Sequence, residues 1–243
     1  MRVLVISDIH GNLTALDTVL DDAGEYDAVW CLGDLVGYGP DPNECVERVR
    51  GLPDLQCLIG NHDQAALGEI DLNLFNADAR DAIAWTEAAL TPETHAYLEA
   101  LPEAVEIGKY TLVHGSPRQP VWEYVLDKTV AAQNFPYFAT PYCLVGHTHS
   151  PVIFTQLTDD TPVQEKRPRP GERLALERTR RILNPGSVGQ PRDSNPEAAY
   201  AMLDFEAAVW ETRRVAYDVA ETQARMEGFA LPERLIARLA YGW

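Results

Sequence analysis

Five short polar clusters follow apolar, strand-like stretches of the sequence, and they contain five of the six histidines of the chain. The clusters are Asp8-Ile9-His10-Gly11-Asn12, Gly33-Asp34, Gly60-Asn61-His62-Asp63, His114-Gly115 and Gly146-His147-Thr148-His149. Ligand sites of α/β sheets lie at the carboxyl ends of strands, which is where these clusters are expected. Carboxylate, imidazole and amide groups without a thiolate favour Mn, Fe, Co, Ni or Zn ions in five or six coordination over a structural zinc or calcium site.

Each cluster taken alone also has a structural interpretation, as a helix-capping Asp or a hydrogen-bonded core His. Five such clusters at strand ends together favour a metal site. Asp8 with His10, and His147 with His149, are two residues apart, so in extended backbone both side chains of a pair would point the same way and hold one ion. The clusters offer seven candidate ligands, which are Asp8, His10, Asp34, Asn61, His114, His147 and His149. Seven ligands exceed what one ion takes from a protein, which predicts two divalent metal ions.

The elements that position these clusters follow from the hydrophobic pattern. Apolar runs predict strands at 3–7, 27–32, 55–59, 110–113, 143–145 and 152–154, and alternation predicts antiparallel strands at 173–183, 198–204 and 208–215. Leu13, Leu16 and Leu20 share one face of a first helix, and Asp41-Pro42 opens a second that ends near Arg50. We therefore expect an α/β (α+β) fold with two mixed sheets packed face to face and helices outside.

Two segments stand apart within an otherwise single domain that spans 1–243. Residues 64–105 have helical spacing and are predicted to form a helical cover over the sheet ends. Residues 158–172 are polar and rich in proline and charge, which predicts an exposed hairpin loop. Pro232 near a helix start, with Leu235, Ile236 and Leu239 on one face, predicts a packed C-terminal helix.

The chain is strongly acidic, with 20 Lys plus Arg against 37 Asp plus Glu and a formal charge of −17. Nucleic-acid and anionic-lipid binding need basic surfaces, so we expect no long nucleic acid and no membrane as partner. No apolar segment approaches the ~20 residues of a membrane span, and no charged leader precedes the first strand. Four scattered cysteines without a CxxC pair favour a reduced, cytoplasmic protein; a homo-oligomer is left open.

The order of the clusters resembles the calcineurin-like metallophosphoesterases, whose pattern D-x-H, GD, GNH-D/E, H and GH-x-H runs here from Asp8 to His149. The later Asn184-Pro185-Gly186-Ser187 is similar to a turn of bacterial and archaeal members. The segment GDLVGYGP resembles the branch described as diadenosine tetraphosphatase-related phosphoesterases. The resemblance implies a four-layer αββα sandwich, which agrees with the two-sheet fold expected from the pattern.

The resemblance also implies a role for each clustered residue: one ion held by Asp8, His10 and His149, a second by Asn61, His114 and His147, Asp34 bridging both ions, and His62 as proton donor. Two such ions lower the pKa of a shared water, and the resulting hydroxide attacks phosphorus while a general acid protonates the leaving oxygen. An ordinary pKa near ~6.5 would suit His62 to this role at neutral pH. The alternative is a structural histidine bonded to Asp63 or Asp34.

The sequence departs from the protein Ser/Thr phosphatases and the symmetrical dinucleoside tetraphosphatases just after Asp34. Those families have an arginine there that binds phosphate, whereas this chain has Gly37 and Tyr38. Without that guanidinium, dianionic monoesters gain less, and singly charged phosphodiesters become relatively better substrates. Arg118 and Arg192 either take over phosphate binding or are solvated surface side chains.

The predicted function is metal-dependent hydrolysis of small organic phosphates, chiefly phosphodiesters. A nucleotidase or dinucleoside polyphosphate hydrolase is the alternative enzyme, and Trp122 with Tyr124 could stack on a nucleobase or pack as a lid. A non-catalytic, metal-binding protein-interaction scaffold is the alternative from another class, although scaffolds of this kind are expected to lose ligands. His95 is expected to be an ordinary helix residue, and Asn12 either a helix cap or a phosphate contact.

Overall fold

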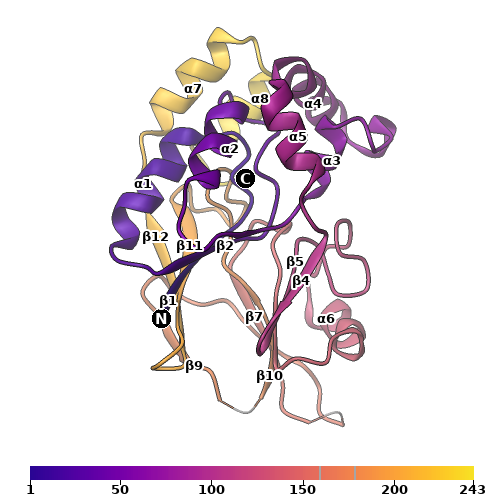
Figure 1. Cartoon of the computed structure of the whole chain (residues 1–243), viewed down its shortest axis with the longest axis vertical. Coiled ribbons are helices and arrows are strands. Elements are labelled where there is room, and N and C mark those ends of the chain that lie inside the picture. The colour runs from indigo at the N-terminus through magenta and orange to yellow at the C-terminus, as the bar shows by residue number, and fades with distance from the viewer. Residues whose placement is uncertain (159, 178) are drawn as a thin grey trace.

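Two six-stranded mixed sheets form the centre of the computed structural model, which describes residues 1–158, 160–177 and 179–243 (Figure 1). The first sheet has the order β3 (Gln56–Cys57), β2 (Ala28–Cys31), β1 (Arg2–Ile6), β11 (Ala198–Asp204), β12 (Val209–Val215) and β9 (Arg173–Ala175). The second has the order β4 (Ala104–Ile107), β5 (Tyr110–Val113), β6 (Tyr142–Leu144), β10 (Arg180–Asn184), β7 (Val152–Gln156) and β8 (Gln164–Lys166). The two mixed sheets confirm the predicted fold class.

Three apolar cores separate four layers. Strand β1 shows the arrangement, because successive side chains of a strand point to opposite faces. Val3 and Val5 pack between the two sheets, and Leu4 and Ile6 pack against helices on the outer face. That outer face carries α1 (Leu13–Ala23) and α2 (Pro42–Arg50), α7 (Val219–Gly228) packs against α1, and α6 (Lys128–Asn134) covers the second sheet (Figure 1). All residues of β2 are buried, as expected for an inner strand of a parallel arrangement.

A helical layer lies over one end of the sheets. It contains α3 (Asn61–Ala66), α4 (Ala77–Ala89), α5 (Pro92–Glu99) and the C-terminal α8 (Glu233–Arg238) (Figure 1). Asn76 and Thr91 cap α4 and α5 by accepting from backbone N–H groups in the first turn. Leu235 and Leu239 are buried against α4, so the predicted C-terminal helix is confirmed. Helix α7 is an element that the sequence pattern did not indicate.

The predicted strand region at 173–183 is wrong as a single unit, because its two halves belong to different sheets. Strand β9 pairs with β12 in the first sheet, whereas β10 lies between β6 and β7 in the second. Alternation of apolar residues shows that a segment is extended but not which sheet it joins. The predicted loop at 158–172 contains the exposed strand β8, which pairs with β7; Asp159 and Arg178 lie outside the described residues.

Candidate metal centre

Every predicted ligand lies just beyond the carboxyl end of a strand, as expected. Strands β1, β2 and β3 are parallel neighbours in the first sheet, and β5 and β6 are parallel neighbours in the second. The first sheet supplies Asp8, His10, Asp34 and Asn61, and the second supplies His114, His147 and His149. The site therefore lies where the strand ends of both sheets meet, and all seven residues are buried.

The backbone at five of these residues is left-handed rather than extended. The φ values are 53° at Asp8, 51° at His10, 55° at Asp34, 63° at His147 and 57° at His149. Side chains rarely occupy this region, and each instance costs about 1–3 kcal/mol. The predicted extended geometry of the two i, i+2 pairs is therefore wrong. Strain gathered at these positions is typical of a functional site.

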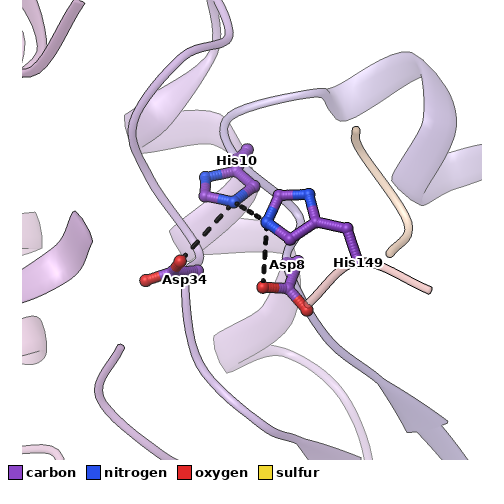
Figure 2. A group of neighbouring side chains, drawn as sticks. All are labelled: Asp8, His10, Asp34 and His149. Carbon is purple, nitrogen blue, oxygen red and sulfur yellow. Dashed lines mark hydrogen bonds and ion pairs between the residues drawn. The ribbon is translucent and has the colours of Figure 1, made fainter. Parts of the chain in front are cut away.

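Asp8, His10, Asp34 and His149 form a first group, with ligand atoms that all lie within 4.8 Å of one another (Figure 2). His10 Nε2 is 3.1 Å from His149 Nε2 and 3.5 Å from Asp34 Oδ2. His149 Nε2 is 3.3 Å from Asp8 Oδ1. The backbone N–H of His147 donates to both oxygens of Asp8 at 3.1 Å, which joins the loop after β6 to the loop after β1.

Asp34, His114 and His147 form a second group, which shares Asp34 with the first. His114 Nε2 is 3.3 Å from Asp34 Oδ2, 3.2 Å from His147 Nδ1 and 3.3 Å from the Asn61 side-chain oxygen. The Asp34 Oδ2 atom thus faces both groups, and it has no hydrogen-bond partner among the described residues. The grouping coincides with the one that the family resemblance implies.

Backbone carbonyls fix the orientation of the imidazoles and leave their lone pairs facing inward. In the first group, His10 Nδ1 donates to the Val36 carbonyl at 3.1 Å and His149 Nδ1 donates to the Gln190 carbonyl at 2.6 Å. Both Nε2 atoms are then acceptors, although they lie only 3.1 Å apart. Two buried acceptors this close repel each other unless a cation lies between them.

The second group follows the same rule with other carbonyls. His114 Nδ1 donates to the Leu32 carbonyl at 2.8 Å, and His147 Nε2 donates to the Trp122 carbonyl at 3.2 Å. The remaining ring nitrogens meet at 3.2 Å. Imidazoles oriented by carbonyls around an unpartnered carboxylate oxygen are the usual surroundings of a protein-bound metal ion. The residues therefore fit two divalent cations.

Electrostatics distinguish the two groups. Burial lowers the pKa of His10 and of His149 well below the ordinary range, so both rings are neutral, and burial raises the pKa of Asp8 to about 7. Burial would also lower the pKa of His114, but the Asp34 carboxylate outweighs it and raises that pKa to about 9. A proton on His114 can hence take the place of a cation in the second group, whereas both imidazoles of the first group are neutral.

Asp63 joins the loops that carry Asp34 and Asn61. Its carboxylate accepts from the backbone N–H groups of Asp34, Val36 and Gly60 at 2.9, 3.0 and 2.9 Å. Asp34 Oδ1 in turn accepts from the His62 backbone N–H at 2.9 Å. These bonds leave Oδ2 of Asp34 as the atom that faces the ligands. Asp63 is thus a positioning residue.

His62 lies beside the first group but is not part of it. Its ring centroid is 4.9 Å from that of His10, 4.3 Å from that of Tyr38 and 5.1 Å from that of Phe75. Burial lowers the pKa of His62 to about 4, so the prediction of an ordinary pKa is wrong. Its Nδ1 has no hydrogen-bond partner within the described part of the chain, which argues against the structural alternative of bonds to Asp63 or Asp34.

Aromatic residues line the other side of the site. Tyr124, which is 41% exposed, stacks on the His147 ring with centroids 3.7 Å apart. Trp122 packs against Phe75 with centroids 5.4 Å apart, and its carbonyl orients His147. Both residues therefore reach the centre, although the present contacts are the packing contacts of a lid.

Of the other candidates, Arg118 is bound to Glu123 by several hydrogen bonds and is not free to hold a phosphate. Arg192 is not simply a solvated side chain, because its guanidinium lies over the Tyr38 ring at 5.6 Å. Asn12 caps α1 by accepting from the Ala15 N–H, and His95 is exposed on α5, as expected. Gln190 was missed, since it acts through a backbone carbonyl that leaves no mark in a sequence.

Comparison with known proteins gives a consistent result. The calcineurin-like phosphoesterase superfamily domain matches residues 1–208. The chain belongs to this superfamily. The protein is thus a hydrolase whose family uses divalent metal ions, and the family prediction is confirmed.

Individual relatives differ in how much of the chain they match. The crystal structure of a metallophosphoesterase from Sphaerobacter thermophilus is 49% identical and superposes with a TM-score of 0.92 over 100% of this chain and 99% of that one. An uncharacterized protein of Methanocaldococcus jannaschii is 37% identical over 99% of this chain and 98% of its own length. A symmetrical bis(5'-nucleosyl)-tetraphosphatase of Erwinia tasmaniensis is 40% identical over 67 residues, which is 26% of this phosphoesterase and 24% of that protein.

Proposed function

We propose that this phosphoesterase hydrolyses small organic phosphates, with phosphodiesters preferred over monoesters. One divalent transition-metal ion would be held by Asp8, His10 and His149, a second by Asn61, His114 and His147, and both by Asp34. The observation that carries the proposal is the convergence of inward-facing acceptors on Asp34 Oδ2, which two cations would satisfy. Such ions, when bound, supply an activated water and neutralise charge on the phosphoryl group.

The side chains around the ions then have separate tasks. Asp34 keeps Oδ2 directed at both groups of ligands, because Oδ1 accepts a hydrogen bond from the His62 backbone N–H. The carbonyls of Val36, Gln190 and Leu32 each hold one ring nitrogen and so orient three imidazoles toward the ligand groups. These fixed orientations mean that little reorganisation is needed when substrate binds.

His62 is proposed as the proton donor to the leaving oxygen. The ring is neutral in the free protein because burial lowers its pKa to about 4. The negative charge of a bound phosphoryl group favours the protonated ring and raises that pKa. Nδ1 has no competing partner among the residues described, so it is available to receive and deliver a proton.

The preference for diesters rests on the surroundings of His62. A Cβ at Gly37 would lie 2.9 Å from His62 Nδ1, and Tyr38 packs on the same ring. These two residues occupy the place where related phosphatases carry a phosphate-binding arginine, so a doubly charged monoester gains no guanidinium contact there. A singly charged diester would have gained less binding energy from such an arginine, so the missing guanidinium weakens its binding less than that of a monoester.

The test compares bis-p-nitrophenyl phosphate with p-nitrophenyl phosphate on protein loaded with Mn²⁺. We expect bound metal at two ions per chain and a higher kcat/KM for the diester. A monoester preference would contradict the substrate class. Two bound ions with no hydrolysis of either ester would contradict the catalytic role and favour the scaffold alternative.

A second candidate substrate class is nucleotides or dinucleoside polyphosphates. Trp122, Phe75 and Tyr124 form an aromatic wall beside His147 and His62, and aromatic faces stack on nucleobases. The Trp122→Ala variant should then lose turnover of a nucleotide ester but keep that of a p-nitrophenyl ester; equal losses would reject base stacking. Manganese as the native ion, a cytoplasmic location and the exclusion of long nucleic acids stay predictions; no described helix is both long and apolar enough to cross a membrane.

A further inference from the structure

Arg192 and Arg238 meet beside the metal centre without an ion-pair partner among the described residues. Their guanidinium groups donate to the same atom, Oε1 of Gln190, at 2.8 and 3.2 Å. The nearby Arg214 and Arg225 differ, because each is paired with a carboxylate. Two arginines without carboxylate partners lie side by side although the protein has a formal charge of −17. Such a pair would be stabilised by a bound anion.

Gln190 ties this arginine pair to the metal centre. The residue is 2% exposed, and its backbone carbonyl accepts from His149 Nδ1 at 2.6 Å. Its side-chain Nε2 and the Nε of Arg192 are both buried without a hydrogen-bond partner in the described chain. Buried donors without an acceptor cost about 1–3 kcal/mol each. An anion bound between these groups would satisfy them.

Tyr38 connects the pair to the catalytic side chains. Its ring lies under the Arg192 guanidinium at 5.6 Å and contacts the rings of His62 at 4.3 Å and His10 at 4.7 Å. Tyr38 has a left-handed backbone with φ of 63°, which is rare for a bulky residue and holds the ring in this place. A ligand bound to Arg192 would thus adjoin the site of hydrolysis.

The positive charges of the two arginines lie at increasing distance from the metal centre, with Arg192 nearer to it than Arg238. The charge of Arg192 acts on the pKa values of Asp8, His10 and His149, and the charges of Arg192 and Arg238 both act on the pKa of Tyr38. Burial, together with the Arg192 charge, lowers the pKa of Arg238 to about 10. This repulsion between like charges would be relieved by an anion. An extended polyanion with one phosphate at the ions and another at the arginines fits this gradient.

We propose that Arg192, Arg238 and Gln190 form a subsite for a second phosphoryl group of the substrate, joined to the one that is hydrolysed at the metal centre. The subsite rests on the proposed function and narrows its substrate class to esters that carry an additional phosphate. Guanidinium groups suit this role because they donate in a fork that matches phosphate oxygens. Arg192 and Arg238 are the specificity-determining residues.

The kinetic test uses two thymidine p-nitrophenyl esters, one of the 5'-monophosphate and one of the 5'-triphosphate, on Mn²⁺-loaded protein. The leaving group and the nucleoside are the same, so the ratio of the two kcat/KM values reports the added phosphates. We expect Arg192→Gln and Arg238→Gln each to lower this ratio about tenfold, the loss of one charge-assisted hydrogen bond. The matched control is Arg234→Gln, which removes an exposed arginine from the same helix, α8.

A binding test separates failure of the subsite from failure of the proposed function. Inorganic pyrophosphate is titrated into metal-free protein by calorimetry, so that no metal can be chelated and no turnover is needed. We expect binding that weakens about tenfold in both arginine variants. An unchanged ratio in the kinetic test would overturn the proposal, as would an equal decrease in Arg234→Gln. Pyrophosphate binding without any change of the ratio would indicate a site for free anions and would also overturn it.

Discussion

A single added methyl group at Gly60 should disable the metal centre. A Cβ at this position would lie 2.1 Å from Asp34 Oδ1 and 2.5 Å from the Asp34 backbone nitrogen. The backbone itself tolerates alanine, since φ is −106° and ψ is 176°. The Gly60→Ala variant is therefore a purely steric perturbation, aimed at the carboxylate shared by both groups of ligands.

The size of the effect follows from the contact. Ordinary van der Waals contacts of a Cβ begin at 3.4 Å, so the Asp34 carboxylate or the Gly60 loop must move by more than 1 Å. Neither moves freely, because Oδ1 accepts from the His62 N–H and the Asp34 N–H donates to Asp63, both at 2.9 Å. A misplacement of about 1 Å at a catalytic group costs about 10²-fold in rate. Overpacking costs about 1–3 kcal/mol of stability, which is a few degrees of Tm in a domain of this size.

The assay measures bound metal, kcat/KM for bis-p-nitrophenyl phosphate and the Tm of the metal-free protein. We expect Gly60→Ala to hold less than two ions per chain and to lose about 100-fold in kcat/KM, with Tm lowered by a few degrees. The control is Gly228→Ala, since no atom lies within 4 Å of a Cβ there, and it should keep the metal content, the kcat/KM and the Tm of the parent protein. Full metal content and activity in a folded Gly60→Ala variant would refute the role of the Asp34 position.

Three further variants test other parts of the site. Asp34→Asn keeps the shape but removes the charge shared by both groups, so bound metal should fall below two ions and kcat/KM by at least about 100-fold, more than loss of a supporting residue costs; two ions with normal turnover would contradict this. His62→Gln should slow esters with poor leaving groups about 10²–10⁴-fold but good ones much less, with the exposed His95→Gln as control, and an equal loss across leaving groups would reject the acid role. Glu123→Gln should cost about 1.5–3 kcal/mol of unfolding free energy at pH 7. Hydrogen bonds from Arg118 lower the folded pKa of Glu123 to about 2 from an ordinary 4.5, so this stabilisation is present above 4.5 and is lost as pH falls towards 2; urea unfolding should show the two proteins converging there, and a constant difference would contradict the assignment.

The position of the candidate ligands at strand ends could be predicted because these residues lie next to strong hydrophobic runs. Val3 to Ile6 and Ala28 to Cys31 are buried on both faces, so their sequence is apolar throughout and the first polar residues mark the strand ends. Asp8 and Asp34 follow shortly after these strands, and their carboxylates, together with the imidazole ligands, narrow the choice of metal ion. Fold class and candidate ligands were therefore accessible from pattern alone.

Other features depend on backbone geometry that side-chain patterns do not encode. The left-handed turns at Asp8 and His147 replaced the expected extended pairs, and they place His147 and His149 in different ligand groups. The lone-pair directions depend on carbonyls such as those of Leu32 and Gln190, which any residue type would supply. The pKa of His62 depends on burial by Tyr38 and Phe75, which are distant in sequence.

The acidic composition has a different meaning once the charges are placed. Only two of the seven candidate ligands are carboxylates, Asp8 and Asp34, so two divalent ions would leave a positive centre, and Arg192 with Arg238 would extend it. The excess of carboxylates lies elsewhere on the chain. Long polyanions would meet that repulsion along their length, whereas a small phosphate would experience mainly the local field, which is stronger inside a buried site than at the solvent-exposed surface. We therefore expect the net charge to disfavour long polyanions but not small phosphates.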